Sequence, residues 1–290
     1  MLASALLCSL NLVARRGDYA DYLDALPAPP SVPALWTSSE GDALQASPLR
    51  QKCAASRRLW THAHAALGLQ LELDAFLGLI ALVRSRAYSS RPLLTLVPVM
   101  EMINHAPAAT ATKEFDGETF RVTAAVDLET GDELTLDYGG GLGNADLLDI
   151  YGFTLENNPR DTLALAVADA DVDVLGAASS LAPKALKHYR RQHVTTEDRV
   201  NAAIRGMAGS EVDYERPLTL RNEREAVREL VAAVEARLAA YETAPDDDAT
   251  LLAGGTLEGK ELDAVRVRLS EKLILLQQLE RAAQSAKFMC

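Results

Sequence analysis

Apolar residues recur every three or four positions in the first third of the chain. Leu2, Leu6, Leu10 and Val13 predict a buried amphipathic helix at the N-terminus. Two further helices are expected over residues 47–67 and 74–88, the second with Asp74 as its N-cap. Between the first helix and these two, the segment LPAPPSVPALW carries four prolines, which favour an extended connector.

The middle of the chain changes to the alternating pattern of β-strands. LLTLVPV predicts a short buried strand ended by Pro98, and EFDGETF carries a DG turn between apolar flanks, typical of a hairpin. FRVTAAV and ELTLDY are expected to be strands separated by the turn LETGDE. TLALAVADADVDVL is expected to form one further strand.

Beyond Ala182 the spacing is helical again. Two long amphipathic helices are predicted, and the segment TAPDDDATLLAGG between them is expected to be a loop, so that the pair forms an antiparallel hairpin. The acidic run Asp246–Asp248 within it is interpreted as a loop or a helix N-cap. Their apolar positions are Val227, Leu230, Val234, Leu238 and Tyr241 in the first, and Leu262, Val265, Leu269, Leu273, Leu276 and Leu279 in the second. Helical ends around a β-rich middle predict an α+β protein.

Length and charge restrict the classes of function. The 290 residues are enough for one large domain or two ordinary ones, and the net charge of −12 disfavours sequence-independent nucleic-acid binding. Cys8, Cys53 and Cys290 are far apart and odd in number, which favours reduced thiols inside a cell. The N-terminal apolar run precedes its arginines and is too short to span a bilayer, so neither a signal peptide nor a membrane anchor is expected. A monomer is expected.

Glycines crowd the stretch LTLDYGGGLGNADLLDIYGF, in which a strand ends at Tyr138 and a helix is expected to close at Tyr151. Glycines between a strand and a helix often hold phosphate. This loop lacks both the Gly-Lys-Ser/Thr ending of a P-loop and the GxGxxG spacing of a dinucleotide fold. We therefore interpret it as a sharp turn.

Three motifs follow one another along the chain: VRSRAY, VPVMEMINHAP and DYG…N…YGF. The matching residues are Asn104 and His105, then Tyr138 and Gly139, Asn144, and Tyr151, Gly152 and Phe153. In this order the motifs resemble the SET-domain methyltransferases, in particular the subgroup typified by the Rubisco large-subunit methyltransferases. The resemblance runs from about residue 18 to residue 278.

The resemblance implies a fold and a division into domains. Residues 1–158 would form an incomplete SET β-fold, with a helical insertion over about 1–90 and a β and pseudoknot region over about 93–158. Residues 159–290 would form an all-α domain that helps to present a protein substrate. In SET folds the segment after the tyrosine tucks beside the Asn-His block, and bulky side chains would obstruct that crossing.

The resemblance also implies chemistry: transfer of a methyl group from S-adenosylmethionine to a lysine side chain of a protein. Tyr138 would be the catalytic residue, directing its hydroxyl at the reacting methyl and amine without ionising. Tyr88 and Tyr138 would line the channel for the substrate lysine. A narrow apolar channel can lower the pKa of that lysine and so increase its nucleophilic amine form. The cofactor-binding residues would be Arg86, Glu101, Asn104, His105, Tyr151, Gly152 and Phe153. No metal is expected.

Two departures from the family keep alternatives open. Glu101 stands where the family usually has the shorter Asp, and nothing in residues 1–20 resembles the Gly-rich strand-turn that contacts the cofactor in family members. The sequence is therefore expected to be a truncated gene model or a natural fragment. One alternative is a non-catalytic protein-binding fragment of such an enzyme. The other is a methyltransferase that acts on histidine, although Tyr88 favours lysine.

Overall fold

The computed structural model describes residue 5 and residues 8–12, 15–90, 93–168, 171–176, 180–204 and 212–287. The described residues fall into two compact units. Unit 1 comprises Met1–Thr37, Lys52–Leu142 and Asp146–Phe153, and unit 2 comprises Ser38–Gln51, Gly143–Ala145 and Thr154–Cys290. The expected domain boundary between residues 158 and 159 stays a prediction.

Helices form much of unit 1. They are α2 (Ala20–Ala25), most of α4 (Pro48–Leu67), α5 (Leu73–Arg86) and most of α6 (Asn144–Tyr151). The proline-rich connector is extended as predicted, except for a short 3-10 helix over Pro33–Leu35. At the N-terminus, Ala5 and residues 8–12 are helical, whereas the predicted positions Leu2, Leu6 and Val13 lie outside the described residues.

The predicted N-cap of α5 was wrong. The helix begins at Leu73 with Glu72 in the N-cap position, and Asp74 lies within the first turn. There the Asp74 carboxylate interacts favourably with the positive end of the helix dipole. Phe76 and Ile80 of α5 are fully buried, so this helix is a central element of the core of unit 1.

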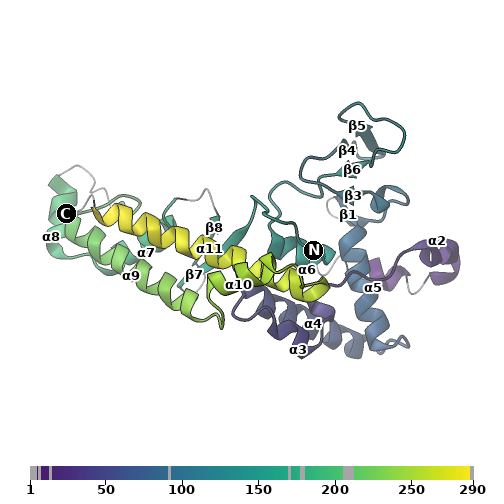
Figure 1. Cartoon of the computed structure of the whole chain (residues 1–290), viewed down its shortest axis with the longest axis horizontal. Coiled ribbons are helices and arrows are strands. Elements are labelled where there is room, and N and C mark those ends of the chain that lie inside the picture. The colour runs from purple at the N-terminus through teal and green to yellow at the C-terminus, as the bar shows by residue number, and fades with distance from the viewer. Residues whose placement is uncertain are drawn as a thin grey trace. The chain divides into compact units, whose positions relative to one another are not determined.

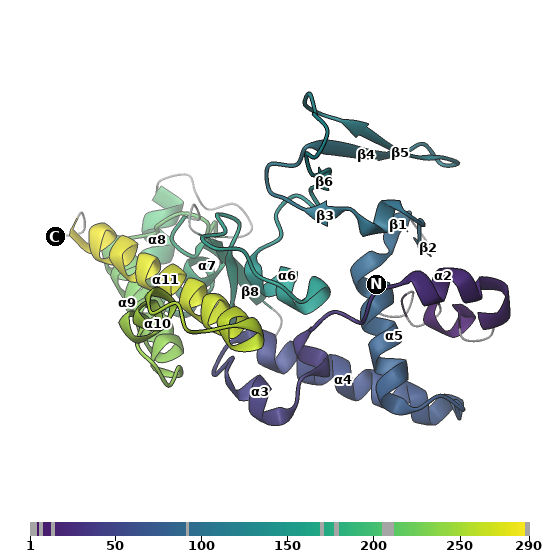
Figure 2. The same cartoon turned by 45° about the vertical axis from the view of Figure 1, so that its right-hand side comes forward.

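Short strands of unit 1 form two small sheets. β1 (Tyr88–Ser90) and β2 (Leu93–Thr95) pair antiparallel. The second sheet has the order β3-β6-β4-β5 and contains the predicted hairpin β4 (Ala111–Phe115) and β5 (Phe120–Ala124) (Figure 2). β6 (Thr135–Leu136), the strand-forming part of ELTLDY, runs parallel to β3 (Asn104–His105) and to β4. Because His105 pairs with Leu136, the Asn-His segment lies beside the chain that leads to Tyr138.

Unit 2 contains a second hairpin where one strand was predicted. β7 (Thr162–Ala168) and β8 (Asp171–Gly176) pair antiparallel, with Thr162 opposite Gly176. Each has its own alternation, and Leu163, Leu165 and Leu175 are buried in one cluster. β7 ends at Ala168 and β8 begins at Asp171, so the interpretation as one continuous strand was wrong.

This hairpin means that the expected all-α domain over residues 159–290 was wrong in part, although helices predominate there as predicted. The helices of unit 2 are α3 (Ser38–Asp42), α7 (Pro183–Gln192), α8 (Thr196–Ile204), α9 (Leu220–Ala239), α10 (Pro245–Ala253) and α11 (Gly259–Lys287). The two predicted long helices, α9 and α11, lie side by side (Figure 1). Within the part of the chain that the structure describes, every helix is too short or too polar to cross a membrane.

The segment between the long helices is not a loop throughout, because its acidic run, interpreted as a loop or a helix N-cap, forms the first turn of α10. Pro245 occupies the first turn, where its missing N–H costs no hydrogen bond, and the Asp247 carboxylate accepts from the Ala244 N–H at 2.8 Å. Asp248 is fully buried and paired with Arg268 and Lys272 of α11. Arg268 and Lys272 thus neutralise Asp248, which belongs to an acidic run that the sequence alone would place in solvent.

Candidate active site

A cavity of about 430 Å³ lies within unit 1. Its walls come from the end of α5, β1, the 3-10 helix Met100–Met102, the β4–β5 hairpin, the start of the glycine loop and the end of α6. Five of the predicted site residues line it: Arg86, Tyr88, Glu101, Tyr138 and Tyr151. These five residues belong to five different segments of the chain and thus meet at one cavity.

Tyr138 is fixed to the chain around the Asn-His pair by both its side chain and its backbone. Its hydroxyl donates to the Ile103 carbonyl at 2.8 Å, and its N–H donates to Nδ1 of His105 at 3.2 Å. The Tyr138 and His105 ring centroids lie 5.1 Å apart. Burial raises the pKa of Tyr138, against an opposing effect of Arg86. The phenol is therefore protonated near neutrality and able to donate.

An aromatic cluster surrounds this tyrosine. The ring of Tyr151 lies 4.6 Å from that of Tyr138, and Phe153 lies 6.2 Å from Tyr151 and 6.1 Å from His105. Burial, reinforced by the neighbouring phenols of Tyr138 and Tyr88, raises the pKa of Tyr151 to about 12. His105 and Phe153 pack against these tyrosine rings but are not among the residues that line the cavity. Their expected contact with the cofactor stays a prediction.

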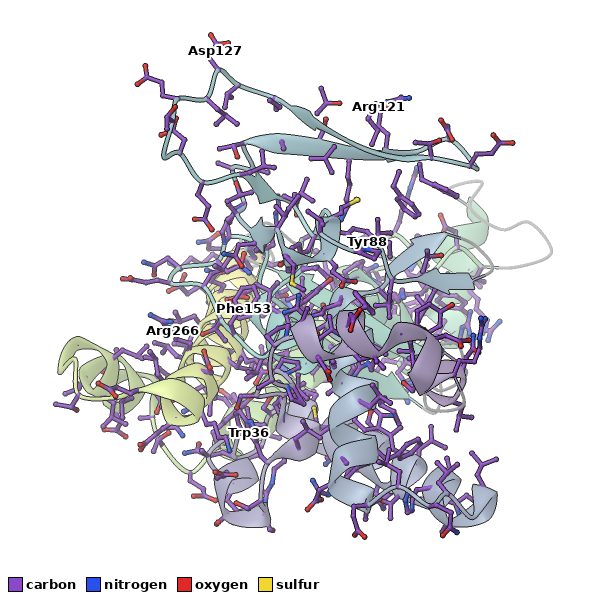
Figure 3. The ribbon with its side chains drawn as sticks, turned by 90° about the vertical axis from the view of Figure 1, so that its right-hand side faces the viewer. Trp36, Tyr88, Arg121, Asp127, Phe153 and Arg266 are labelled. Carbon is purple, nitrogen blue, oxygen red and sulfur yellow. The ribbon has the colours of Figure 1, made fainter. Side chains whose placement is uncertain are left out.

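Tyr88 and a lysine that the sequence did not single out form another wall. The Tyr88 hydroxyl donates to the Met100 carbonyl at 3.2 Å, and burial, with smaller effects of Tyr138 and Glu101, raises its pKa to about 12. Nζ of Lys113 lies 5.0 Å from the centroid of the Tyr88 ring. In Figure 3 Arg121 on β5 points away from the region of Tyr88, as expected for alternating sides of a strand. The same alternation in the segment ATKEF places Lys113 and Phe115 on one face of β4, so the sequence alone could have indicated this position of Lys113.

Arg86 and Glu101 contribute unpartnered polar atoms. Nη1 of Arg86 donates to the Glu101 carbonyl at 2.9 Å, whereas its Nε is buried without a hydrogen-bond partner among the described residues. Oε1 of Glu101 accepts from the hydroxyl of Tyr22, a residue that sequence reasoning missed, and Oε2 is buried with no partner in the part of the chain that the structure describes. Buried polar atoms without partners are costly, so a ligand acceptor that reached Nε of Arg86, or a ligand donor that reached Oε2 of Glu101, would be stabilised there.

Asn104 and Gly152 lie apart from the cavity lining. Asn104 is exposed, and its Nδ2 donates to Glu133 at 2.7 Å, so its expected contact with the cofactor stays a prediction. Gly152 has φ +77°, and a Cβ there would lie 2.8 Å from the Ser31 nitrogen. Its bare backbone therefore allows the chain to turn sharply against the proline-rich connector.

Comparison with solved structures defines the class of fold as that of an LSMT-type SET domain. The chain superimposes on the SET domain of LSMT bound to lysine and AdoHcy with a TM-score of 0.79 at 20% identity, covering 98% of this chain and 75% of that one. Rubisco LSMT bound to AdoMet gives a TM-score of 0.77 at 21% identity, covering 98% and 76%. The predicted α+β class with a helical C-terminal region is thereby confirmed.

Sequence comparisons give the more particular relationship. Residues 169–275 match the family model of the Rubisco LSMT substrate-binding domain. The chain is 26% identical to the chloroplastic [fructose-bisphosphate aldolase]-lysine N-methyltransferase of Arabidopsis thaliana, and 25% identical to the chloroplastic Rubisco large-subunit N-methyltransferase of Nicotiana tabacum. These alignments cover 72% and 71% of this chain, which spans about half the length of each relative (50% and 49%). The chain is therefore LSMT-like, as predicted.

The residues around the cavity fit S-adenosylmethionine, whose amino-acid end carries a carboxylate and an ammonium group. The unpartnered Nε of Arg86 is a donor for a carboxylate, and the unpartnered Oε2 of Glu101 is an acceptor for an ammonium or hydroxyl group. The longer side chain of Glu101, compared with the usual Asp, still reaches the cavity wall. The chain thus offers one donor and one acceptor of the required kinds.

Proposed function

We propose that the chain is part of an S-adenosylmethionine-dependent protein-lysine N-methyltransferase. The observation that carries the proposal is the cavity on which Tyr138, Tyr88, Arg86 and Glu101 converge. The LSMT-type fold and the names of the relatives support it. In the proposed reaction the cofactor supplies an electrophilic methyl group. Arg86 and Glu101 hold its amino-acid end, and Tyr138 directs a neutral phenol at the reacting centre.

The tyrosine wall suits a lysine acceptor. A ring such as Tyr88 can hold the ammonium form by cation–π attraction, while partial burial favours loss of its proton before the attack. We propose that unit 2, which contains the match to the substrate-binding family, contributes to binding of the protein substrate. An intracellular monomer is part of the proposal, and cytoplasm, nucleus and plastid all stay open.

Calorimetric titration of the 290-residue chain with S-adenosylmethionine tests cofactor binding. We expect a Kd on the order of micromolar. Replacing Arg86 with Met should weaken binding ~10- to 100-fold, because a charge-assisted hydrogen bond is lost. Arg121→Met on β5 is the matched control and should leave the Kd unchanged. A chain that binds no cofactor would support the alternative of a non-catalytic protein-binding fragment.

Transfer of labelled methyl groups tests the acceptor. The chain is incubated with tritiated S-adenosylmethionine and a protein extract, the labelled proteins are hydrolysed in acid, and the amino acids are separated. Label in methylated lysines supports the proposal, whereas label in methylhistidine supports the histidine-directed alternative.

A further inference from the structure

One lysine of this chain lies in the cavity itself. Among the seven lysines of the sequence, Lys113 is the one that lines the cavity in the described structure. It lies on β4, opposite Val122 of β5, and shares its face of the strand with Phe115. The ring of Phe115 stacks on that of Phe120 at 4.3 Å. The hairpin therefore places Lys113 on the same face of β4 as one member of this aromatic pair.

The Lys113 amine contacts a carbonyl oxygen and an aromatic ring. Its Nζ lies 3.3 Å from the Tyr138 carbonyl and 5.0 Å from the Tyr88 ring centroid. Lys272 has contacts of the same kind with Thr243 and Tyr241, but it also binds a carboxylate, as do Lys52, Lys187 and Lys260. A carbonyl oxygen and an aromatic face can both hold an amine, and a substrate lysine that enters the cavity would meet the same two groups.

The direction of its pKa shift also sets Lys113 apart from Lys52, the other lysine of unit 1 that the structure describes. Burial lowers the pKa of Lys113, with Asp137 opposing the shift. Burial acts in the same direction on Lys52, but the carboxylates of Asp149 and Asp146 outweigh it, so the pKa of Lys52 is raised. At a given pH a larger fraction of Lys113 is the neutral amine, the form that can attack a methyl group.

We propose that Lys113 is an internal methyl acceptor of this chain, a self-methylation site inside the cavity. The inference rests on the proposed function, because S-adenosylmethionine is the co-reactant. The lone pair of neutral Nζ forms a bond to the sulfonium methyl carbon, and the carbon–sulfur bond breaks to leave a neutral thioether. The methylated amine carries the positive charge, and it can release a proton to water. Until it is displaced, Lys113 also occupies the face of Tyr88 that an incoming lysine would use.

Mass spectrometry tests the site directly. The purified chain is incubated with S-adenosylmethionine carrying a deuterated methyl group and digested with a protease that does not cut at lysine. We expect label on Lys113, at a rate per molecule that is independent of protein concentration. Lys113→Arg should abolish this label, the matched control Lys52→Arg should keep it, and added free L-lysine should slow it. Label confined to other lysines, or a rate that rises in proportion to protein concentration, would overturn the proposal.

A measurement without cofactor tests the placement of the amine. Limited reaction with acetic anhydride across a pH series should modify Lys113 at lower pH than Lys52, and the reverse order would contradict the proposed environment. The titration with S-adenosylmethionine distinguishes a failure of the proposed methyltransferase function from a failure of the self-methylation proposal. A chain that binds no cofactor would contradict both proposals. A chain that binds it and methylates free L-lysine, but leaves Lys113 unlabelled, ends only the self-methylation proposal.

Discussion

The hydroxyl of Tyr138 donates a hydrogen bond to the carbonyl of Ile103 at 2.8 Å, although 35 residues separate the two positions. This bond fixes the phenol beside the Asn-His segment and leaves it at the wall of the cavity. In the proposed reaction the same phenol oxygen is aimed at the methyl and the amine. A variant that lacks this oxygen therefore distinguishes a role of Tyr138 in methyl transfer from a role in cofactor binding.

Tyr138→Phe should lower the rate of methyl transfer ~100- to 1000-fold, the usual loss when one preorganised donor is removed from a reacting centre. The loss of the bond to Ile103 should lower the free energy of unfolding by only about 1 kcal/mol. Cofactor affinity should be nearly unchanged, because Arg86 and Glu101 remain.

The measurements are label transfer to an added protein extract, calorimetry and denaturant unfolding. The control is Tyr189→Phe, which removes a partly buried phenol from α7 of unit 2. Equal transfer rates for the Tyr138 variant and the parent chain would remove this tyrosine from the mechanism.

The sequence predicted features that depend on short-range spacing. The helices α4, α9 and α11 and the DG hairpin follow from periodicity and turn residues that lie close together in the chain. The position of Tyr138 beside His105 came from a family resemblance, since no local pattern predicts a contact across 33 residues. Where partners are distant, the prediction failed. The acidic start of α10 looked like a loop because Lys272, which pairs with Asp248, lies 24 residues further on.

Lys113 shows the same limit within the site. Its position on one face of β4 followed from the alternation in the sequence. What its amine contacts did not follow, because Tyr88 and Tyr138 belong to other segments of the chain. Arg86 and Glu101 were identified by resemblance, whereas the hydroxyl of Tyr22 on Oε1 of Glu101 joins residues 79 positions apart. Long-range pairs of this kind have no sequence signature.

The glycine loop should be sensitive at one position and tolerant at another. A Cβ on Gly143 would lie 2.9 Å from the Arg160 carbonyl oxygen, so Gly143→Ala forces the backbone apart and should cost about 1–3 kcal/mol of unfolding free energy. A Cβ on Gly140 would project into open space, so Gly140→Ala should be neutral or slightly stabilising. Denaturant unfolding measures both. Equal effects would show that the loop needs glycine for backbone freedom and not for the close approach at Gly143.

The buried charge cluster of unit 2 should be essential to its stability. Asp248 is fully buried and accepts hydrogen bonds from both Arg268 and Lys272, which is also fully buried. Asp248→Asn leaves two buried cations without their carboxylate and should destabilise the chain by about 3–5 kcal/mol. Adding Lys272→Met should recover part of this loss.

An exposed pair provides the contrast. Glu40 and Lys260 form a salt bridge with side chains 37% and 41% exposed, so Glu40→Gln should change the unfolding free energy by at most about 1 kcal/mol. Thermal or denaturant unfolding compares the two neutralised carboxylates. A similar small cost for Asp248→Asn would mean that water reaches the buried cluster.

Glu271 should make the stability of the chain depend on pH. Burial raises the pKa of this carboxyl to about 7, although hydrogen bonds from Tyr241 and Ser47 act in the opposite direction. The folded chain therefore holds a proton that the unfolded chain, with an ordinary value of 4.5, has released. The stabilisation from this group is fully present below about pH 4.5 and is lost as the pH rises through 7, by about 3 kcal/mol in all.

Glu271→Gln keeps the neutral form at every pH and should remove this dependence. The free energy of unfolding, measured between pH 5 and pH 8 for the parent chain and the variant, should fall more steeply in the parent chain. Asp198, whose pKa is lowered to about 2 by its hydrogen bonds despite the opposing effect of burial, acts in a separate acidic window and leaves this range unaffected. Parallel curves for the two proteins would mean that Glu271 is ionised in the folded chain, with its charge stabilised by Tyr241 and Ser47.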